Sequence, residues 1–261
     1  MGRHGSAVVV SDKTGDVPAG YERLGGPIPV FHAPRLAQRA REVRQYLEQG
    51  AGALTEILAV EPPDLTALIV ADEDWDDAPR DNRHPYPPGL PYFTRSAEPP
   101  VLVLPTSLSA VFQPRTEATL PLAVWHELAH AFLLGREVVR TPAWFRELLP
   151  QAAAAAIARR ESLLEGHLAH IDREPGFTVR GFKGRANAAE QMAFQNLLLA
   201  LGAAALEEFG EGFLKALVHA LWEEDEIVGE TRAEALLVGA LGPRGGEWLK
   251  SRPEFGWRGE L

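Results

Sequence analysis

The stretch Trp125-His126-Glu127-Leu128-Ala129-His130 is an H-E-x-x-H motif within an apolar segment that has helical spacing. Residues four apart lie on one face of a helix, with Cβ atoms roughly 5–6 Å apart. His126 and His130 can therefore bind one metal ion, and Glu127 can reach a water molecule at that ion as a general base. The alternative is an amphipathic helix in which both histidines are ordinary core or surface residues.

The composition of the chain limits the classes of function. Of the 261 residues, 46% are hydrophobic and 24% are charged, which is typical of a globular protein with a core. The net charge of −10 argues against nucleic acid and against anionic membranes as partners, because both attract basic surfaces. The chain contains no cysteine, so any metal must be bound by His, Asp or Glu.

The apolar segments are too short or too often interrupted by charges to act as a signal peptide or a membrane anchor. We therefore expect no membrane span and a cytoplasmic protein. The sequence does not define an oligomeric state.

Strand patterns come early in the chain and helix patterns late, an order that indicates the α+β class. Short apolar strands are expected over residues 28–31, 65–71 and 101–104. An amphipathic helix is expected over residues 35–59, interrupted near Gly50 and Gly52. Further helices are expected over residues 120–134, 143–160 (with a kink or break at Pro150), 161–172, 186–201, 203–220 and 230–241.

A cluster of proline and glycine between residues 175 and 185 marks a change from mixed structure to helices. We expect a first domain over residues 1–178, which holds the strands and the H-E-x-x-H helix. A helical subdomain over residues 179–261 is expected to pack on it.

A catalytic zinc usually has three protein ligands and one open position. The metzincin pattern needs a Gly and a His shortly after the second motif histidine, and residues 131–136 have neither at the required place. The segment Thr141-Pro142-Ala143-Trp144-Phe145-Arg146-Glu147 starts the next helix and offers a carboxylate. Glu161 and Glu165 are alternatives if Pro150 bends that helix.

The motif helix followed by this Pro-x-Trp-hydrophobic-x-Glu segment resembles the gluzincin superfamily of zinc metallopeptidases, over about residues 121–157. The resemblance implies that Zn²⁺ is bound by His126, His130 and Glu147, and that Glu127 is the general base. It also implies a zincin-like fold, with a short N-terminal mixed sheet and the motif helix packed on a second ligand helix.

The same resemblance would place residues 86–93 near an edge strand that binds extended peptide. Many gluzincins have Asn and Gly beside the ligand glutamate, where this chain has Arg146 and Leu148. Some have Asp four residues further on, where this chain has Gln151. These departures leave the subfamily and the substrate undefined.

The spacing of the two helices agrees with the ligand assignment. Only residues 136–140 connect them, so antiparallel packing is expected, and Glu147 in the second turn can face the motif helix. The alternative is that Glu147 is a surface carboxylate near a helix N-terminus, where negative charge is favoured.

Peptide hydrolysis also needs a donor that stabilises the oxyanion. The candidates are Tyr92, His84 and His170, although residues of these types are more often structural or solvent-exposed than catalytic. Tyr86, His167 and His219 are weaker candidates of the same kind.

These observations predict a zinc-dependent metallopeptidase that acts on a peptide or protein substrate. A non-catalytic protein-binding module on the same scaffold is the main alternative, with residues 86–93 or the C-terminal helices as its surface. A metal-free helical structural protein is the third possibility.

Overall fold

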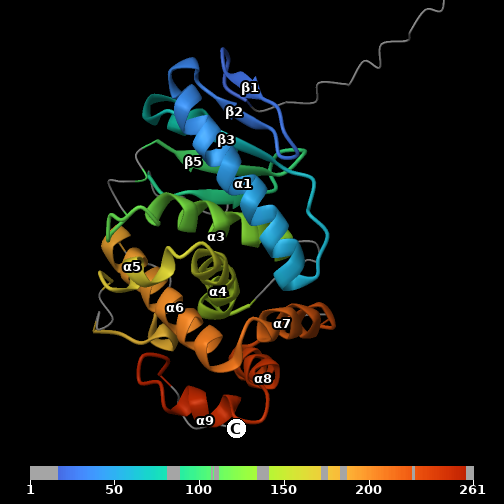
Figure 1. Ribbon diagram of the computed structural model, residues 1–261, viewed down its shortest axis with the longest axis vertical. Helices are drawn as coiled ribbons and strands as arrows, with labels where there is room; N and C mark the ends of the chain where they lie inside the picture. Colours follow the sequence, from blue (N-terminus) through green and yellow to red (C-terminus); the bar gives the residue numbers. More distant parts are fainter. Residues whose placement is uncertain are drawn as a thin grey trace, which may run out of the picture.

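The computed structural model describes residues 17–80, 89–106, 108, 112–133, 141–171, 176–182, 187–224 and 227–256. In these ranges one five-stranded sheet lies at one end of the molecule, and α1 crosses one of its faces (Figure 1). Helix α3 follows below the sheet, then α4 and α6, and the C-terminal helices lie at the far end (Figure 1). The expected α+β class is confirmed.

The sheet has the strand order β1-β2-β3-β5-β4. Its three inner strands run parallel, and the two edge strands β1 and β4 are antiparallel to their neighbours. The strands expected near residues 28–31, 65–71 and 101–104 are confirmed as β2, β3 and β5. The strand bounds are β1 Glu22–Leu24, β2 Val30–His32, β3 Thr66–Val70, β4 Tyr92–Thr94 and β5 Val101–Pro105.

The two faces of the sheet belong to different apolar clusters, because successive side chains of a strand point to opposite faces. Ala67 and Ile69 of β3 join the large core shared with the helices. Leu68 and Val70 join a smaller cluster on the other face, which also contains Tyr92 of β4.

Three helices build the centre of the large core: α1 (Ala37–Leu58), α3 (Thr119–Leu133) and α4 (Ala143–Arg160). Helix α3 contacts α1, α4, β4 and β5. The expected interruption of the first helix is wrong, since α1 continues through both of its glycines. Helix α4 also continues without a break through Pro150, where a kink or a break was expected.

Of the later helices, α6 has the most extensive contact with α4, and α5 and α7 contact it as well. The expected boundary between helices 186–201 and 203–220 is wrong, because Gly202 lies inside α6, where a Cβ atom would come within 2.8 Å of Ala152 Cα on α4. The helix expected over 161–172 is shorter than predicted. The bounds are α5 Leu164–Leu168, α6 Ala188–Phe209, α7 Gly212–Trp222, α8 Glu230–Leu241 and α9 Gly245–Lys250, with short 3-10 helices at Pro34–Leu36, Asp72–Asp77 and Val179–Gly181.

Two further findings concern organisation. The large core contains side chains from both sides of residue 178, for example Trp144 and Phe255, and the division into two domains stays a prediction.

No helix in the described ranges combines the length and the apolar composition needed to cross a bilayer.

Gly50 is expected to be needed for the contact between α1 and α3. A Cβ atom there would lie 2.5 Å from Cδ1 of Trp125 and 3.0 Å from Cδ2 of Leu128. Gly52, on the same helix, has open space at its Cβ position. Alanine favours a helix over glycine by about 1 kcal/mol at either position, whereas overpacking costs about 1–3 kcal/mol.

We therefore expect Gly52→Ala to raise the free energy of unfolding by up to about 1 kcal/mol and Gly50→Ala to lower it. Urea denaturation of both variants measures the difference. An equal stabilisation by the two substitutions would contradict a close contact between Gly50 and the Trp125 ring.

Candidate metal centre

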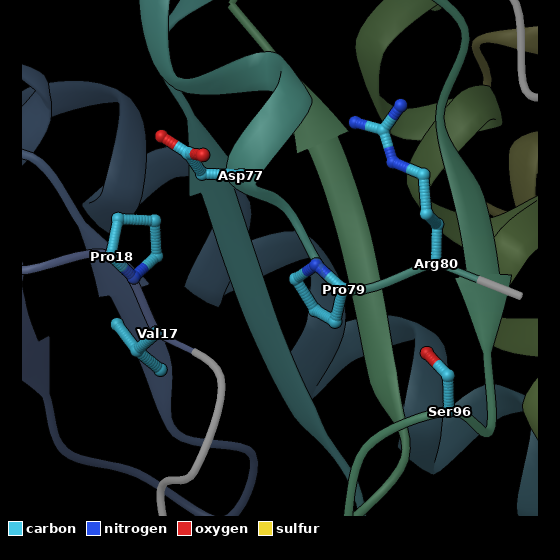
Figure 2. A pocket seen from close by; sticks show the side chains of 6 residues that line it. All are labelled: Val17, Pro18, Asp77, Pro79, Arg80 and Ser96. Atoms are coloured by element: carbon cyan, nitrogen blue, oxygen red, sulfur yellow. The ribbon is translucent and has the colours of Figure 1, made fainter.

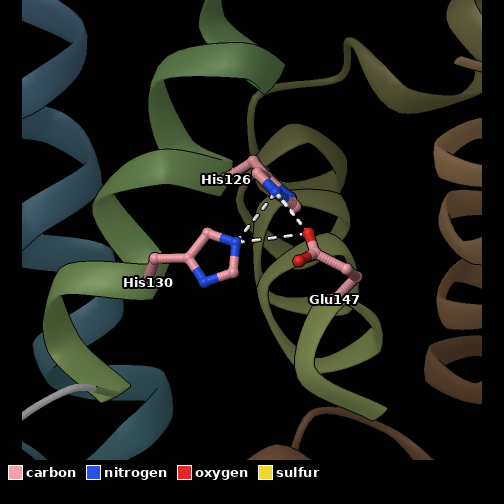
Figure 3. Close-up of side chains that lie close together, drawn as sticks. All are labelled: His126, His130 and Glu147. Carbon is pink, nitrogen blue, oxygen red and sulfur yellow. Dashed lines mark hydrogen bonds and ion pairs between the residues drawn. The ribbon is translucent and has the colours of Figure 1, made fainter. Parts of the chain in front are cut away.

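The motif side chains His126 and His130 lie one turn apart on α3 and point toward Glu147 in the second turn of α4 (Figure 3). The two Nε2 atoms are 3.1 Å apart. Oε2 of Glu147 lies 3.3 Å from Nε2 of each histidine. The structure thus brings together the three side chains that the resemblance implied as metal ligands, and they could hold a metal ion.

The separations of these three atoms fit one small tetrahedral ion. Two ligand atoms at about 2.0–2.1 Å from such an ion, in a tetrahedral arrangement, lie about 3.3–3.4 Å from each other. The three ligand atoms match this spacing, and a fourth position would remain open. Within the described residues, no other group of three His, Asp or Glu side chains has ligand atoms as close as these.

Among the described residues, the polar contacts of the His126 ring lie on the side that faces His130 and Glu147. Its Nδ1 atom is buried and has no hydrogen-bond partner among the described residues, whereas Nε2 faces His130 and Glu147. A buried polar atom without a partner is uncommon in native proteins. When a metal ion binds, the ring proton of His126 must lie on Nδ1, because Nε2 then gives its lone pair to the ion; without an ion, Nε2 can carry the proton and donate it to Glu147.

Glu147 is held in its ionised form. Burial by itself would raise its pKa, but the attraction to His130 and the hydrogen bonds from both histidines keep the pKa well below the usual range for a glutamate. Its second oxygen, Oε1, accepts a hydrogen bond of 3.2 Å from Nε of Arg146. Oε2 is therefore the oxygen left to face the two imidazoles.

The helix that carries Glu147 is anchored next to it by Trp144. The indole N–H of this buried residue donates a 2.8 Å hydrogen bond to Glu230 on α8, and the ring packs edge-on against Phe255. The C-terminal segment thereby fixes the first turn of α4, and with it the direction from which Glu147 approaches α3.

Glu127 is buried beside the metal ligands, and its carboxyl group is close to the edge strand. Burial raises its pKa from 4.5 to about 7; His126 and a hydrogen bond from the backbone of Phe93 oppose the rise, and Glu147 adds to it. Because Phe93 belongs to β4, this hydrogen bond places Glu127 between the cluster and the edge strand. A carboxyl group with a pKa near 7 is well matched to general-base catalysis at neutral pH.

The three ligands are largely buried and still reach solvent. The exposed fractions of their side chains are 9% for His126, 17% for His130 and 15% for Glu147. A catalytic metal centre needs such an opening, because the substrate must reach the ion.

Two of the expected oxyanion donors, Tyr92 and His170, are not part of this cluster. Tyr92 belongs to the opposite face of the sheet, and its hydroxyl donates a 3.0 Å hydrogen bond to the carbonyl oxygen of Pro79. His170 is exposed beyond α5, and His84 lies outside the described residues. Their roles stay predictions.

The alternatives for the third ligand, Glu161 and Glu165, are exposed and are not part of the cluster. His167, a weaker oxyanion candidate, lies 2.7 Å from the hydroxyl of Thr116, and burial lowers its pKa to about 4. It is therefore neutral at physiological pH.

A cavity of about 370 Å³ is lined by residues that do not include the three clustered side chains (Figure 2). It offers one carboxylate, one guanidinium and one hydroxyl, so it lacks a set of metal-binding groups. The guanidinium of Arg80 is engaged with the carbonyl oxygen and the ring of Trp75. The lining residues are Val17, Pro18, Asp77, Pro79, Arg80 and Ser96, none of which belongs to the cluster.

One contact of the site that sequence reasoning missed is made by α6. Gln195 on α6 donates a hydrogen bond to Glu147, although the two residues are 48 positions apart. Nothing in the local sequence around Gln195 indicates this role, because it depends on how α6 packs against α4.

A scan against models of known protein families gives no match, and a search of the curated proteins gives none either. The chemistry of the site is therefore inferred from its own residues.

Proposed function

We propose that the protein is a zinc-dependent hydrolase that cleaves peptide bonds. The observation that carries the proposal is the convergence of two imidazole nitrogens and one carboxylate oxygen at the spacing of a single tetrahedral ion, with the Glu127 carboxyl beside them. Two His and one Glu form one of the recurrent ligand sets of catalytic zinc.

The metal ion and the residues of the chain would contribute different parts of the reaction. Zinc, when bound, supplies Lewis acidity toward a carbonyl oxygen and lowers the pKa of water to about 7. Glu127 removes a proton from the attacking water while the water oxygen bonds to the carbonyl carbon. Glu127 then delivers this proton to the leaving nitrogen as the C–N bond breaks, so that one water is consumed and one acid and one amine form.

The edge strand β4 is the proposed binding surface for the substrate. Strand β4 pairs with β5 along one edge, and no other described strand pairs with its second edge. The backbone of Phe93, in β4, contacts Glu127. An extended peptide added alongside β4 would place a scissile bond next to the carboxylate and the metal ligands. This geometry favours a peptide over a compact small molecule as substrate.

The proposal predicts cleavage of peptides that a chelator abolishes. We expect the purified protein, loaded with one equivalent of Zn²⁺, to cleave members of a mixed peptide library identified by mass spectrometry. A zinc-selective chelator should stop cleavage, and Zn²⁺ added back should restore it.

The controls separate this function from its main alternative. Cleavage that survives the chelator would point to a contaminating or metal-independent peptidase and would overturn the proposal. Stoichiometric zinc without any chelator-sensitive cleavage would favour a non-catalytic protein-binding module on this scaffold.

A further inference from the structure

We propose that Gln195 is a positioning residue of the metal centre and that Gln151 and Gln195 together form a relay of two amides that fixes the ligand Glu147. This inference rests on the proposed metal site and adds α6 to it. The residues come from two helices that pack against each other, Gln151 from α4 and Gln195 from α6.

The relay consists of two hydrogen bonds in series. Nε2 of Gln151 lies 2.6 Å from Oε1 of Gln195, and Nε2 of Gln195 lies 3.1 Å from Oε2 of Glu147. The second bond ends on the oxygen atom that faces both histidines. Gln195 therefore acts on the metal-facing oxygen, whereas Arg146 acts on the other oxygen of the same carboxylate.

The direction of the relay follows from the charge of Glu147. An ionised carboxylate only accepts hydrogen bonds, so Gln195 must turn its NH₂ group toward Glu147. Its carbonyl oxygen then faces the other way, and Gln151 donates to it. The amide of Gln195 is thus held at both ends, which restricts the rotation of the Glu147 carboxylate.

The relay is also neutral. A carboxylate in place of either amide would face Glu147 with a like charge or would add negative charge near the ion. Two imidazoles and one carboxylate leave a bound dication with a net positive charge, and a neutral amide preserves that charge while it supplies the hydrogen bond. We infer that the amides orient the ligand without reducing the Lewis acidity of the site.

The test measures zinc affinity directly. Gln195→Met keeps the length and approximate volume of the side chain and removes both hydrogen bonds. Residues that orient metal ligands typically change metal affinity by 10–100-fold when they are replaced. We expect this loss for Gln195→Met, measured by competition between the protein and a chromogenic zinc chelator.

Gln191→Met is the matched control. Gln191 lies one turn earlier on α6, and its side chain forms no hydrogen bond with any described residue. Its substitution should leave the zinc affinity unchanged. The melting temperatures of all metal-free variants show whether a loss of affinity merely reflects a loss of folding.

Two double mutants test the order of the relay. In the described part of the chain Gln151 is linked by hydrogen bonds to Glu147 through Gln195, so Gln151→Met should weaken zinc binding less than Gln195→Met and should add nothing when the two are combined. In a Glu147→Gln background, Gln195→Met should no longer change the residual zinc affinity. Gln151→Met also provides an independent measurement if Gln195→Met does not fold.

The measurements distinguish a failure of the relay from a failure of the proposed function. A wild-type protein that binds zinc while Gln195→Met binds it equally well would overturn the relay and leave the hydrolase proposal intact. Additive effects of Gln151→Met and Gln195→Met would overturn the series arrangement. A wild-type protein that binds no zinc would overturn both proposals.

Discussion

His126→Ala is expected to reduce the bound zinc from about one ion per chain to a small fraction of one. Zinc sites with a full set of ligands bind with about 10–16 kcal/mol, so the loss of one of three protein ligands removes several kcal/mol and weakens binding on the order of 10²–10⁴-fold. Elemental analysis after dialysis against a low concentration of free Zn²⁺ measures the stoichiometry.

The control for this prediction is His170→Ala, because His170 is exposed and is not part of the cluster. It should retain wild-type zinc content. Zinc at 100 times its dissociation constant should stabilise the wild type by about 2.7 kcal/mol, and this zinc-dependent rise in melting temperature should be absent in His126→Ala. Unchanged zinc content in His126→Ala would place the ion elsewhere in the protein.

The three candidate ligands could be predicted from the sequence because their positions depend on local geometry. His126 and His130 meet wherever their segment is helical, and that segment is α3. Glu147 followed from a resemblance and from a short connection between two helices. In all three cases the distance along the chain is small, so the chain itself limits where the side chains can lie.

The contacts that the sequence did not indicate depend on packing between distant segments. Gln195 reaches Glu147 only because α6 packs on α4, and Phe93 reaches Glu127 only because β4 lies at the edge of the sheet. Strands of three residues, such as β4, are also too short to produce an alternating pattern.

The sequence pattern predicts an interruption near Gly50 and a boundary between two helices at residue 202, and at both positions the structure uses glycine for close packing. At Gly50 a Cβ atom would collide with Trp125, and at Gly202 it would collide with Ala152. Both glycines lie inside long helices that pack closely on another helix. The local preference of glycine against helix, about 1 kcal/mol, is small compared with the burial of such an interface.

The second large effect is expected for Glu127→Gln, which should retain zinc and lose peptide hydrolysis. Gln has nearly the same shape as Glu but cannot accept the proton of the attacking water. Loss of a general base typically reduces the rate by 10²–10⁴-fold. Zinc content and kcat on a cleaved library peptide are the two measurements, and full activity in the variant would remove Glu127 as the base.

The same substitution should stabilise the metal-free protein at high pH. Below pH 4.5 Glu127 is protonated in both the folded and the unfolded chain, so it contributes no pH dependence. Between 4.5 and about 7 the unfolded chain ionises while the buried carboxyl keeps its proton, so the free energy of unfolding falls as the pH rises. With a shift from 4.5 to about 7, the total loss is about 3 kcal/mol.

Glu127→Gln does not show this loss. Its free energy of unfolding should equal that of the wild type at about pH 4 and exceed it by about 3 kcal/mol at about pH 8. Urea unfolding with chelator present measures the difference. The comparison cancels the titration of Glu147, which both proteins share. A glutamate that served mainly to hold the fold together would show the reverse, a loss of stability when replaced. Parallel pH profiles for the two proteins would mean that Glu127 ionises normally in the folded state, which contradicts its burial as the cause of a raised pKa.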